Sequence, residues 1–537
     1  MNSIELNNNS RGVQRWIFPI LLLGLALRLV GLQWGQGYYY FGQGDGMEAY
    51  SVAVDYGQGE PRAMYLAQPN FNERSKLPGP LWTMFCFAGL RFAGSIEGVV
   101  LASILLNTAA IYLTFLLAQR TIGPAAGLWA GLLAATVPSA VFYSLGVYNP
   151  QVMPFLGACL ALALWEVVRG DRSPHIFWVV LLLMIMPQFH MAGIAMWSAV
   201  AVMLVVAGRR LSLGWLIAGA AVGALCYVPY LRGEAAHGWQ NTIGMLSGRS
   251  TRSWDSLKTV STPVNLLINW VPQWTHDFGE YRELGRACFG WFGILLAVNA
   301  ISVVTALLIF AGIGRQLQDT MKGRWRTPRV AFSRAPGPLF LAILLVAPLA
   351  FALVSGHSFH ARYALMLMPA LLALAGGAVT TLLGWQRIGK FFTFALAVTV
   401  CANVWLMAAF YYHQGKRIEQ GDLFIPSFRK METVYQALKA HAGAGHAVQV
   451  EDKAYLHALS PREKARKEVE ALRRYVVVRE REALLTGSAP ALRVQYRLCQ
   501  AADVGADDSC VAFRGNGIAL VAETNALSAE TGAAVPK

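Results

Sequence analysis

The chain has 537 residues, of which 55% are apolar and only 14% are charged, and its mean hydropathy is positive at +0.42. This composition excludes an ordinary soluble globular protein and indicates a polytopic membrane protein. The formal net charge of +15 would suggest nucleic acid in a soluble chain, but the Lys and Arg residues gather in short loops between apolar runs. We therefore interpret them as signals of membrane topology and expect no nucleic-acid partner.

Eleven apolar segments approach the length of about 20 residues that a helix needs to cross a bilayer. They are residues 16–32, 99–118, 125–143, 150–168, 176–186, 192–207, 213–230, 289–313, 339–354, 363–383 and 391–411. If the chain crosses at each of them, the arginine-rich loops fall on the side of the N-terminus, which the positive-inside rule makes cytoplasmic. We expect an α-helical polytopic membrane protein with about 11 transmembrane helices, in a range of 11–13.

A shorter apolar run at residues 79–93 is expected to lie in the outer membrane interface, because counting it as a crossing would invert several later loops. The outward segments are then residues 33–98, 144–149, 187–191, 232–286 and 355–362, together with everything after residue 412. The polar residues that could carry chemistry are thus gathered on one face of the membrane.

The first outer loop, residues 33–98, places Asp45 and Glu48 in a glycine-rich stretch directly after the aromatic residues 38–41. Aromatic residues of this kind mark the membrane interface, so the acids are expected where a lipid-embedded substrate meets water. The same spacing is also that of a capping box, in which Asp45 caps a helix and Glu48 reaches back. The two interpretations are compatible, since a cap residue can still face a cavity.

Basic residues on the same face are candidates for binding an anionic lipid head group. Lys76 leads into the Pro78–Pro80 turn, where its ammonium would meet a lipid phosphate or simply extend to the interface. Arg362 lies at the outer end of a span, against the positive-inside trend, and either a bound head group or interfacial anchoring would explain it. Arg62 is a further candidate in the first loop.

Histidine, asparagine and aromatic residues complete the set of candidates. His190 lies where two short helices are expected to meet, and a lone histidine there is more often a hydrogen-bonded structural residue. His360 comes shortly before Arg362, and Asn149 is the last residue of the second outer segment, residues 144–149. The loop at residues 232–286 is rich in tryptophan, which suits either sugar stacking or interfacial anchoring.

The composition changes after residue 412, where charge density rises and apolar runs shorten. Helical periodicity is expected at residues 427–442 and 461–472, and β-strands at residues 447–450, 475–478, 492–498 and 511–513. We therefore expect two domains: a transmembrane domain at residues 1–412 and a small outward-facing α/β domain at residues 413–537.

Over residues 16–412 the arrangement resembles the GT-C glycosyltransferases that use polyprenyl-phosphate sugars, most closely the protein O-mannosyltransferase and aminoarabinose transferase group. The resemblance rests on short stretches of sequence: residues 45–50, 76–82 and 188–190, and the pair Arg362-Tyr363. Two departures are plain. The two acids are separated by two residues instead of being adjacent, and Asn149 stands where many relatives carry an aspartate.

The resemblance implies a GT-C-like catalytic domain that moves a sugar from a polyprenyl-phosphate donor to an acceptor hydroxyl or phosphate at the outer face, inverting the anomeric centre. Asp45 would be the base, with Glu48 as the alternate or an orienting partner. The donor phosphate would be held by Lys76, Arg62 and Arg362. The acceptor or the sugar would be oriented by Asn149, His190, His360 and Tyr50.

Such chemistry needs no cofactor if enough Lys and Arg surround the departing phosphate. Participation of a divalent cation is the alternative. The expected partners are the lipid-linked donor, a lipid, glycan or protein acceptor, and the membrane itself. The expected location is a bacterial-type inner membrane with a cytoplasmic N-terminus and an outward C-terminal domain. The alternatives are a flippase or transporter of a lipid-linked sugar, and a polysaccharide ligase or polymerase.

Overall fold

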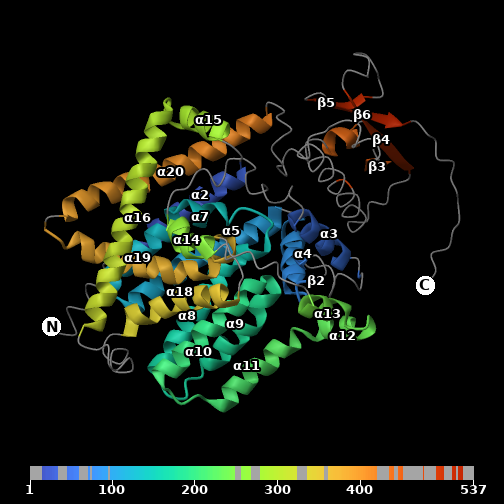
Figure 1. Cartoon of the computed structure of the whole chain (residues 1–537). Coiled ribbons are helices and arrows are strands. Elements are labelled where there is room, and N and C mark those ends of the chain that lie inside the picture. Colours follow the sequence, from blue (N-terminus) through green and yellow to red (C-terminus); the bar gives the residue numbers. More distant parts are fainter. Residues whose placement is uncertain are drawn as a thin grey trace.

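The computed structural model describes residues 15–33, 45–57, 59, 70–72, 75–94, 97–247, 256–267, 278–322, 336–355, 361–386, 388–419, 435–440, 446–450, 476, 492–500, 511–515 and 518–523. Most of these residues are helical, and the long helices gather in one bundle, whereas strands β3 to β6 lie apart from it (Figure 1).

A long apolar helix corresponds to each of the predicted spans. In chain order they are α2 (Ile17–Gln33), α5 (Glu97–Thr121), α6 (Pro124–Thr136), α8 (Met153–Arg169), α9 (Ile176–Phe189), α10 (Ala195–Ala207), α11 (Leu213–Leu225), α16 (Phe292–Met321), α18 (Pro336–Ser355), α19 (Met368–Leu383) and α20 (Gly389–Glu419). Each forms because a continuous apolar run can satisfy its backbone hydrogen bonds internally.

Within the described residues, six helical stretches are long and apolar enough to cross a membrane. The number is seven if α11 and α12 (Val228–Ala236), which are bent by 49° at their junction, form one span. The remaining predicted spans are apolar helices of 10–17 residues. A multi-pass membrane architecture is therefore confirmed, while the predicted number of crossings stays a prediction.

Shorter elements connect these helices. They are α3 (Asp45–Gly57), β1 (Asn70–Asn72), β2 (Ser75–Lys76), α4 (Leu81–Ala93), α7 (Pro138–Phe142), η4 (Asn149–Val152), η5 (Met191–Ile194), α13 (Gln240–Ser247), α14 (Ser256–Leu267), α15 (Phe278–Phe289), η7 (Ala361–Tyr363) and η8 (Leu365–Leu367). The run predicted to lie in the interface is α4, a helix of 13 residues that ends at Gly94 in a left-handed conformation.

Helix α19 lies at the centre of the bundle, with most of its residues buried, and it contacts α5, α6, α16 and α18. Small residues allow this close approach. A Cβ at Gly376 of α19 would collide with the carbonyl oxygen of Ala126 in α6, and a Cβ at Gly157 of α8 would collide with that of Met366. Close backbone packing through small residues is the usual way in which helices associate inside membranes.

Three basic loops lie together at one end of the bundle. Arg120 at the end of α5 forms an ion pair of 3.0 Å with Glu166 near the end of α8. Arg209, after α10, donates from Nε to the carbonyl oxygen of Val168 at 2.9 Å. The backbone nitrogen of Arg172 donates to the carbonyl oxygen of Arg210 at 2.7 Å. The loops after α5, α8 and α10 therefore share one side, as the predicted topology requires.

The C-terminal strands form a four-stranded sheet in the order β3-β4-β6-β5, with β3 (His446–Val450) parallel to β4 (Leu492–Gln500). Strands β5 (Val511–Gly515) and β6 (Ile518–Glu523) pair antiparallel, as do β4 and β6. Three of the four predicted strands are confirmed, and β6 was not predicted.

One expectation for this region is corrected, since Val476, which the prediction places in a strand, is helical. Helix α20 continues past residue 412 and ends at Glu419. A helix is present at residues 435–440, inside the predicted one at 427–442, whereas residues 461–472 lie outside the described part of the chain. The existence of a separate C-terminal domain stays a prediction.

Candidate functional site

Asn149 and the end of α9 meet at the bundle end opposite the basic loops. The chain is extended at Tyr148 and turns into η4 at Asn149, whose Nδ2 donates to the carbonyl oxygen of Phe189 at 2.7 Å. The neighbouring Gln188 is fully buried. The second and third predicted outer segments are thereby joined by a side chain that the sequence singled out.

His190 and Arg362 are connected by contacts with Tyr148 and Tyr363. Together with Asn149 these residues are called the cluster below. The imidazole of His190 stacks on the ring of Tyr363, with 4.8 Å between ring centres. The guanidinium carbon of Arg362 lies 4.9 Å from the centre of the Tyr363 ring and 6.0 Å from that of Tyr148, distances suited to cation–π attraction. Arg362 also donates from Nη2 to the Tyr363 hydroxyl at 3.0 Å.

His190 is held as a neutral ring. Burial, together with the positive charge of Arg362, lowers the pKa of His190 from its usual value near 6.5 to about 3. The backbone nitrogen of Ala192 donates to Nδ1 at 3.2 Å, so the neutral imidazole carries its proton on Nε2. His190 therefore presents a hydrogen-bond donor and no positive charge, and Arg362 supplies the cation beside it.

The turn that follows Lys76 packs against this cluster. Lys76 lies on β2, which pairs antiparallel with β1, and the next four residues, 77–80, are buried. Gly79 has φ +97°, and a Cβ there would collide with the amide group of Gln188. The backbone of β2 is thus fixed near the cluster by a glycine for which no other residue fits.

The acids of the first loop, Asp45 and Glu48, lie on α3, which also carries Tyr50. Helix α3 packs against α4, where Tyr56 and Phe87 meet edge to face with 5.1 Å between ring centres. The side chains of Asp45, Glu48, Tyr50 and Lys76 lie outside what the structure describes.

The structure therefore brings together Asn149, His190, Arg362 and the backbone of the Lys76 turn. Arg62 and His360 lie outside the described residues, and their predicted roles stay predictions. Sequence reasoning included Gln188 only as part of a motif and did not include Tyr148 as a site residue. The signal that could have found Tyr148 is its position directly before Asn149-Pro150.

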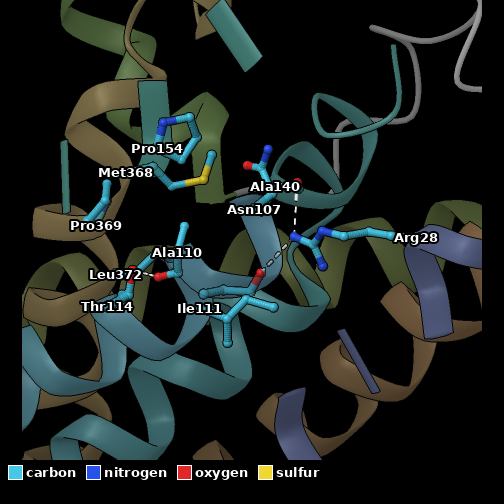
Figure 2. Close-up of a pocket in the computed structure, with 11 residues that line it drawn as sticks. Arg28, Asn107, Ala110, Ile111, Thr114, Ala140, Pro154, Met368, Pro369 and Leu372 are labelled. Atoms are coloured by element: carbon cyan, nitrogen blue, oxygen red, sulfur yellow. Dashed lines mark hydrogen bonds between the residues drawn. The ribbon is translucent and has the colours of Figure 1, made fainter. Parts of the chain in front are cut away.

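A buried arginine was missed. Arg28 of α2 is 1% exposed and lies inside the first predicted span, where an ionisable residue is itself a signal of a specific role. Its guanidinium donates to the carbonyl oxygens of Gly24 at 2.8 Å, Ala140 at 3.1 Å and Ala134 at 3.4 Å. Figure 2 shows Arg28 reaching toward the chain at Ala140, beside Asn107 and Ile111.

The position of Arg28 follows from the break between α6 and α7. Pro138 has no N–H to donate to the carbonyl of Ala134, four residues earlier, and Val137 is extended. Arg28 supplies the missing donor. The cavity drawn in Figure 2 has a volume of about 20 Å³ and is lined by Arg28, Asn107 and other residues of the bundle, which is room for about one water molecule.

The architecture is that of the GT-C fold of polytopic membrane proteins. This assignment rests on the similarity of the chain to two crystal structures of ArnT from Cupriavidus metallidurans. The structure bound to undecaprenyl phosphate has a TM-score of 0.53 and 14% sequence identity, and the match covers 96% of this chain and 99% of ArnT. The apo structure has a TM-score of 0.54 and 13% identity, with 95% and 98% covered.

At this level of identity the likeness shows the fold alone. No family model matches the chain, and no curated protein sequence matches it.

Proposed function

We propose that the protein is a membrane glycosyltransferase that uses a polyprenyl-phosphate-linked sugar as its donor. The observation that carries the proposal is the convergence, at one end of the bundle, of Asn149, His190, Arg362 and the turn after Lys76. The likeness in fold to ArnT bound to undecaprenyl phosphate supports the class of lipid donor. The substrate would then be a phosphodiester whose lipid lies in the bilayer and whose sugar reaches the cluster.

The cations have a defined task in this reaction. When the anomeric carbon is attacked, negative charge grows on the departing lipid phosphate, and preorganised cations lower the barrier. Arg362 is held in place by Tyr148 and Tyr363 and presents a planar fork suited to phosphate oxygens. Lys76 would add a point charge from β2, and Arg62 is the third proposed contact.

The neutral residues would orient the sugar and the acceptor. Asn149 uses Nδ2 to hold Phe189, so its Oδ1 can accept a hydrogen bond from a hydroxyl. His190 would donate from Nε2. Tyr50 and His360 are proposed for the same task. Neither Asn149 nor the neutral His190 with its low pKa is suited to take up a proton at pH 7, so base catalysis falls to the acids of α3.

Asp45 is the proposed base, with Glu48 as its alternate or orienting partner. The base takes the proton from the acceptor hydroxyl as the oxygen forms its bond to the anomeric carbon and the phosphate leaves from the opposite face. A single displacement of this kind inverts the anomeric centre. No metal is proposed, because the departing phosphate is already a charged leaving group and is met by Lys and Arg.

The test is a transfer assay in nanodiscs with polyprenyl-phosphate sugars and extracted envelope acceptors, with donor binding measured in parallel. We expect Asp45→Asn to lower transfer by at least about 100-fold while donor binding survives, as the loss of a catalytic base does. We expect Lys76→Ala and Arg362→Ala to weaken donor binding as well as transfer. Asp319→Asn and Lys322→Ala, an ion pair on the predicted cytoplasmic side, serve as matched controls.

Normal transfer by both Asp45→Asn and Glu48→Gln would refute the assignment of the base. Donor binding without any transfer in the wild type, combined with movement of the donor across the bilayer, would instead favour a flippase.

A further inference from the structure

The segment that follows α11 buries some of its polar side chains and exposes several of its apolar ones. Helices α12 and α13 form a hairpin in which Glu234 is fully buried and Asn241 is 4% exposed. Trp239, directly before α13, is 43% exposed, and Ile243 and Leu246 of α13 are 56% and 84% exposed. This is the reverse of the pattern of a helix that faces water.

The polar interior fixes the two helices together. One carboxylate oxygen of Glu234 accepts the backbone N–H of Thr242 in the first turn of α13 at 2.7 Å. The Tyr230 hydroxyl contacts the Thr242 hydroxyl at 2.9 Å and accepts from Asn241 Nδ2 at 3.0 Å. The hairpin is thus held by specific bonds, so its apolar face does not result from a loosely placed segment.

Ile243 and Leu246 lie three residues apart and therefore on one face of α13, and Trp239 directly precedes the helix. Trp239 also has φ +61°, in the left-handed region that a bulky residue rarely adopts. A glycine or asparagine would adopt this backbone at less cost. The presence of tryptophan there indicates that its side chain is needed.

We propose that this face of the α12–α13 hairpin docks into the lipid interface of the bilayer leaflet next to the candidate site. The face continues the surface of α11, whose side chains Leu213, Ile217 and Leu225 are also more than half exposed and lie in an apolar helix of the membrane domain. The 49° bend after α11 turns the chain out of the direction of that helix. Tryptophan with exposed Arg232 nearby suits the headgroup level.

Docking would have a consequence for the site. Helix α13 packs against β2, the strand that carries Lys76, and Figure 1 shows α13 beside β2. A hairpin seated in the interface would therefore hold the Lys76 strand at the depth of lipid head groups. The docking itself rests only on the hairpin's geometry and stands or falls independently of the proposed sugar transfer.

The first experiment places a lipid-depth probe on each face. Leu246→Cys and Gln240→Cys, made in full-length protein without its other reactive cysteines, are labelled with an environment-sensitive fluorophore in nanodiscs. Gln240 is exposed but lies off the apolar face. We expect nitroxide groups on shallow acyl-chain carbons to quench the Leu246 probe at least about twofold more than the Gln240 probe, with aqueous iodide giving the reverse order.

Equal quenching of both probes by iodide, without quenching by lipid, would overturn the proposal. A photo-crosslinking residue in place of Ile243 gives an independent measurement that needs no cysteine replacement. Lipid adducts support docking, whereas adducts to a second copy, to another segment of the chain or to no partner contradict it. Neither measurement uses a sugar donor or an acceptor. Both results are therefore independent of whether the protein has the proposed enzymatic activity.

Discussion

At the scale of single residues, His190 makes the stability of the folded protein depend on pH. Its pKa is lowered to about 3 in the folded protein, so between pH 3 and 6.5 the unfolded chain binds a proton that the folded chain does not. Stability is then fully present above about pH 6.5 and falls as the pH drops, by up to about 1.4 kcal/mol per pH unit.

We expect the apparent Tm in detergent to fall less steeply from pH 6.5 to 4.5 in His190→Gln than in the wild type. His175→Gln, at an exposed histidine outside the cluster, is the control for the substitution itself. An unchanged slope in His190→Gln would mean that the ring is not held neutral.

Gly79 offers a second prediction at the same scale. Its φ of +97° and the collision of a Cβ with Gln188 make Gly79→Ala costly for two separate reasons. Gly94→Ala has the same kind of backbone strain, at φ +69°, but nothing lies within 4 Å of its Cβ. We expect Gly94→Ala to cost about 1–2 kcal/mol from the left-handed conformation alone, and Gly79→Ala to cost more.

Thermal unfolding of the single variants and of Gly79→Ala with Gln188→Ala measures the difference. The added Gln188→Ala should recover the collision part and leave the backbone part. If Gly79→Ala and Gly94→Ala lower the Tm by the same amount, a Cβ at residue 79 does not collide with Gln188.

At the scale of elements, one arginine connects α2 to the break between α6 and α7. Arg28→Met removes the donor to the carbonyls of Ala134 and Ala140 and should cost about 2–6 kcal/mol, since each unsatisfied buried carbonyl costs roughly 1–3 kcal/mol. Pro138→Ala restores an N–H opposite the Ala134 carbonyl. The cost of Arg28→Met should therefore be smaller in the Pro138→Ala background.

A double-mutant cycle on apparent unfolding free energies checks this coupling. Equal costs in both backgrounds would show that Arg28 does not replace the hydrogen bond that proline removes. Loss of Arg28 should also loosen the contact of α7 with α14, where the Ser139 hydroxyl donates to the Leu266 carbonyl at 2.7 Å.

Hydropathy predicted the places of the long helices because it sums over a window, and a window of 20 apolar residues has few alternatives to a helix in lipid. The same summation hid Arg28, a single charge in an apolar run, and the break at Val137. Arg362 was predicted from its place at the outer end of a span, His190 from its place between two short helices, and Asn149 from the family resemblance. The stacking of His190 on Tyr363, and the contact between Gly79 and Gln188, depend on packing between segments more than 100 residues apart, which no local pattern encodes.

At the scale of the whole molecule, the bundle has two chemically different ends. The basic residues Arg120, Arg172, Arg209 and Arg210 lie at one end, bonded through Glu166, Val168 and each other. The candidate cluster lies where α8 begins and α9 ends, at the other. The positive-inside rule assigns the basic end to the cytoplasm and hence the cluster to the outer face.

Alkaline phosphatase fusions, which are active only outside the cytoplasm, test this orientation. We expect activity for fusions within residues 144–149, 248–255 and 441–445, and none within residues 170–175, 208–212 and 323–335. Equal activity at 208–212 and 248–255 would mean that α11 does not cross the bilayer. Activity reversed at every site would place the cluster in the cytoplasm, where the donor lipid's sugar would have to be presented from the opposite leaflet.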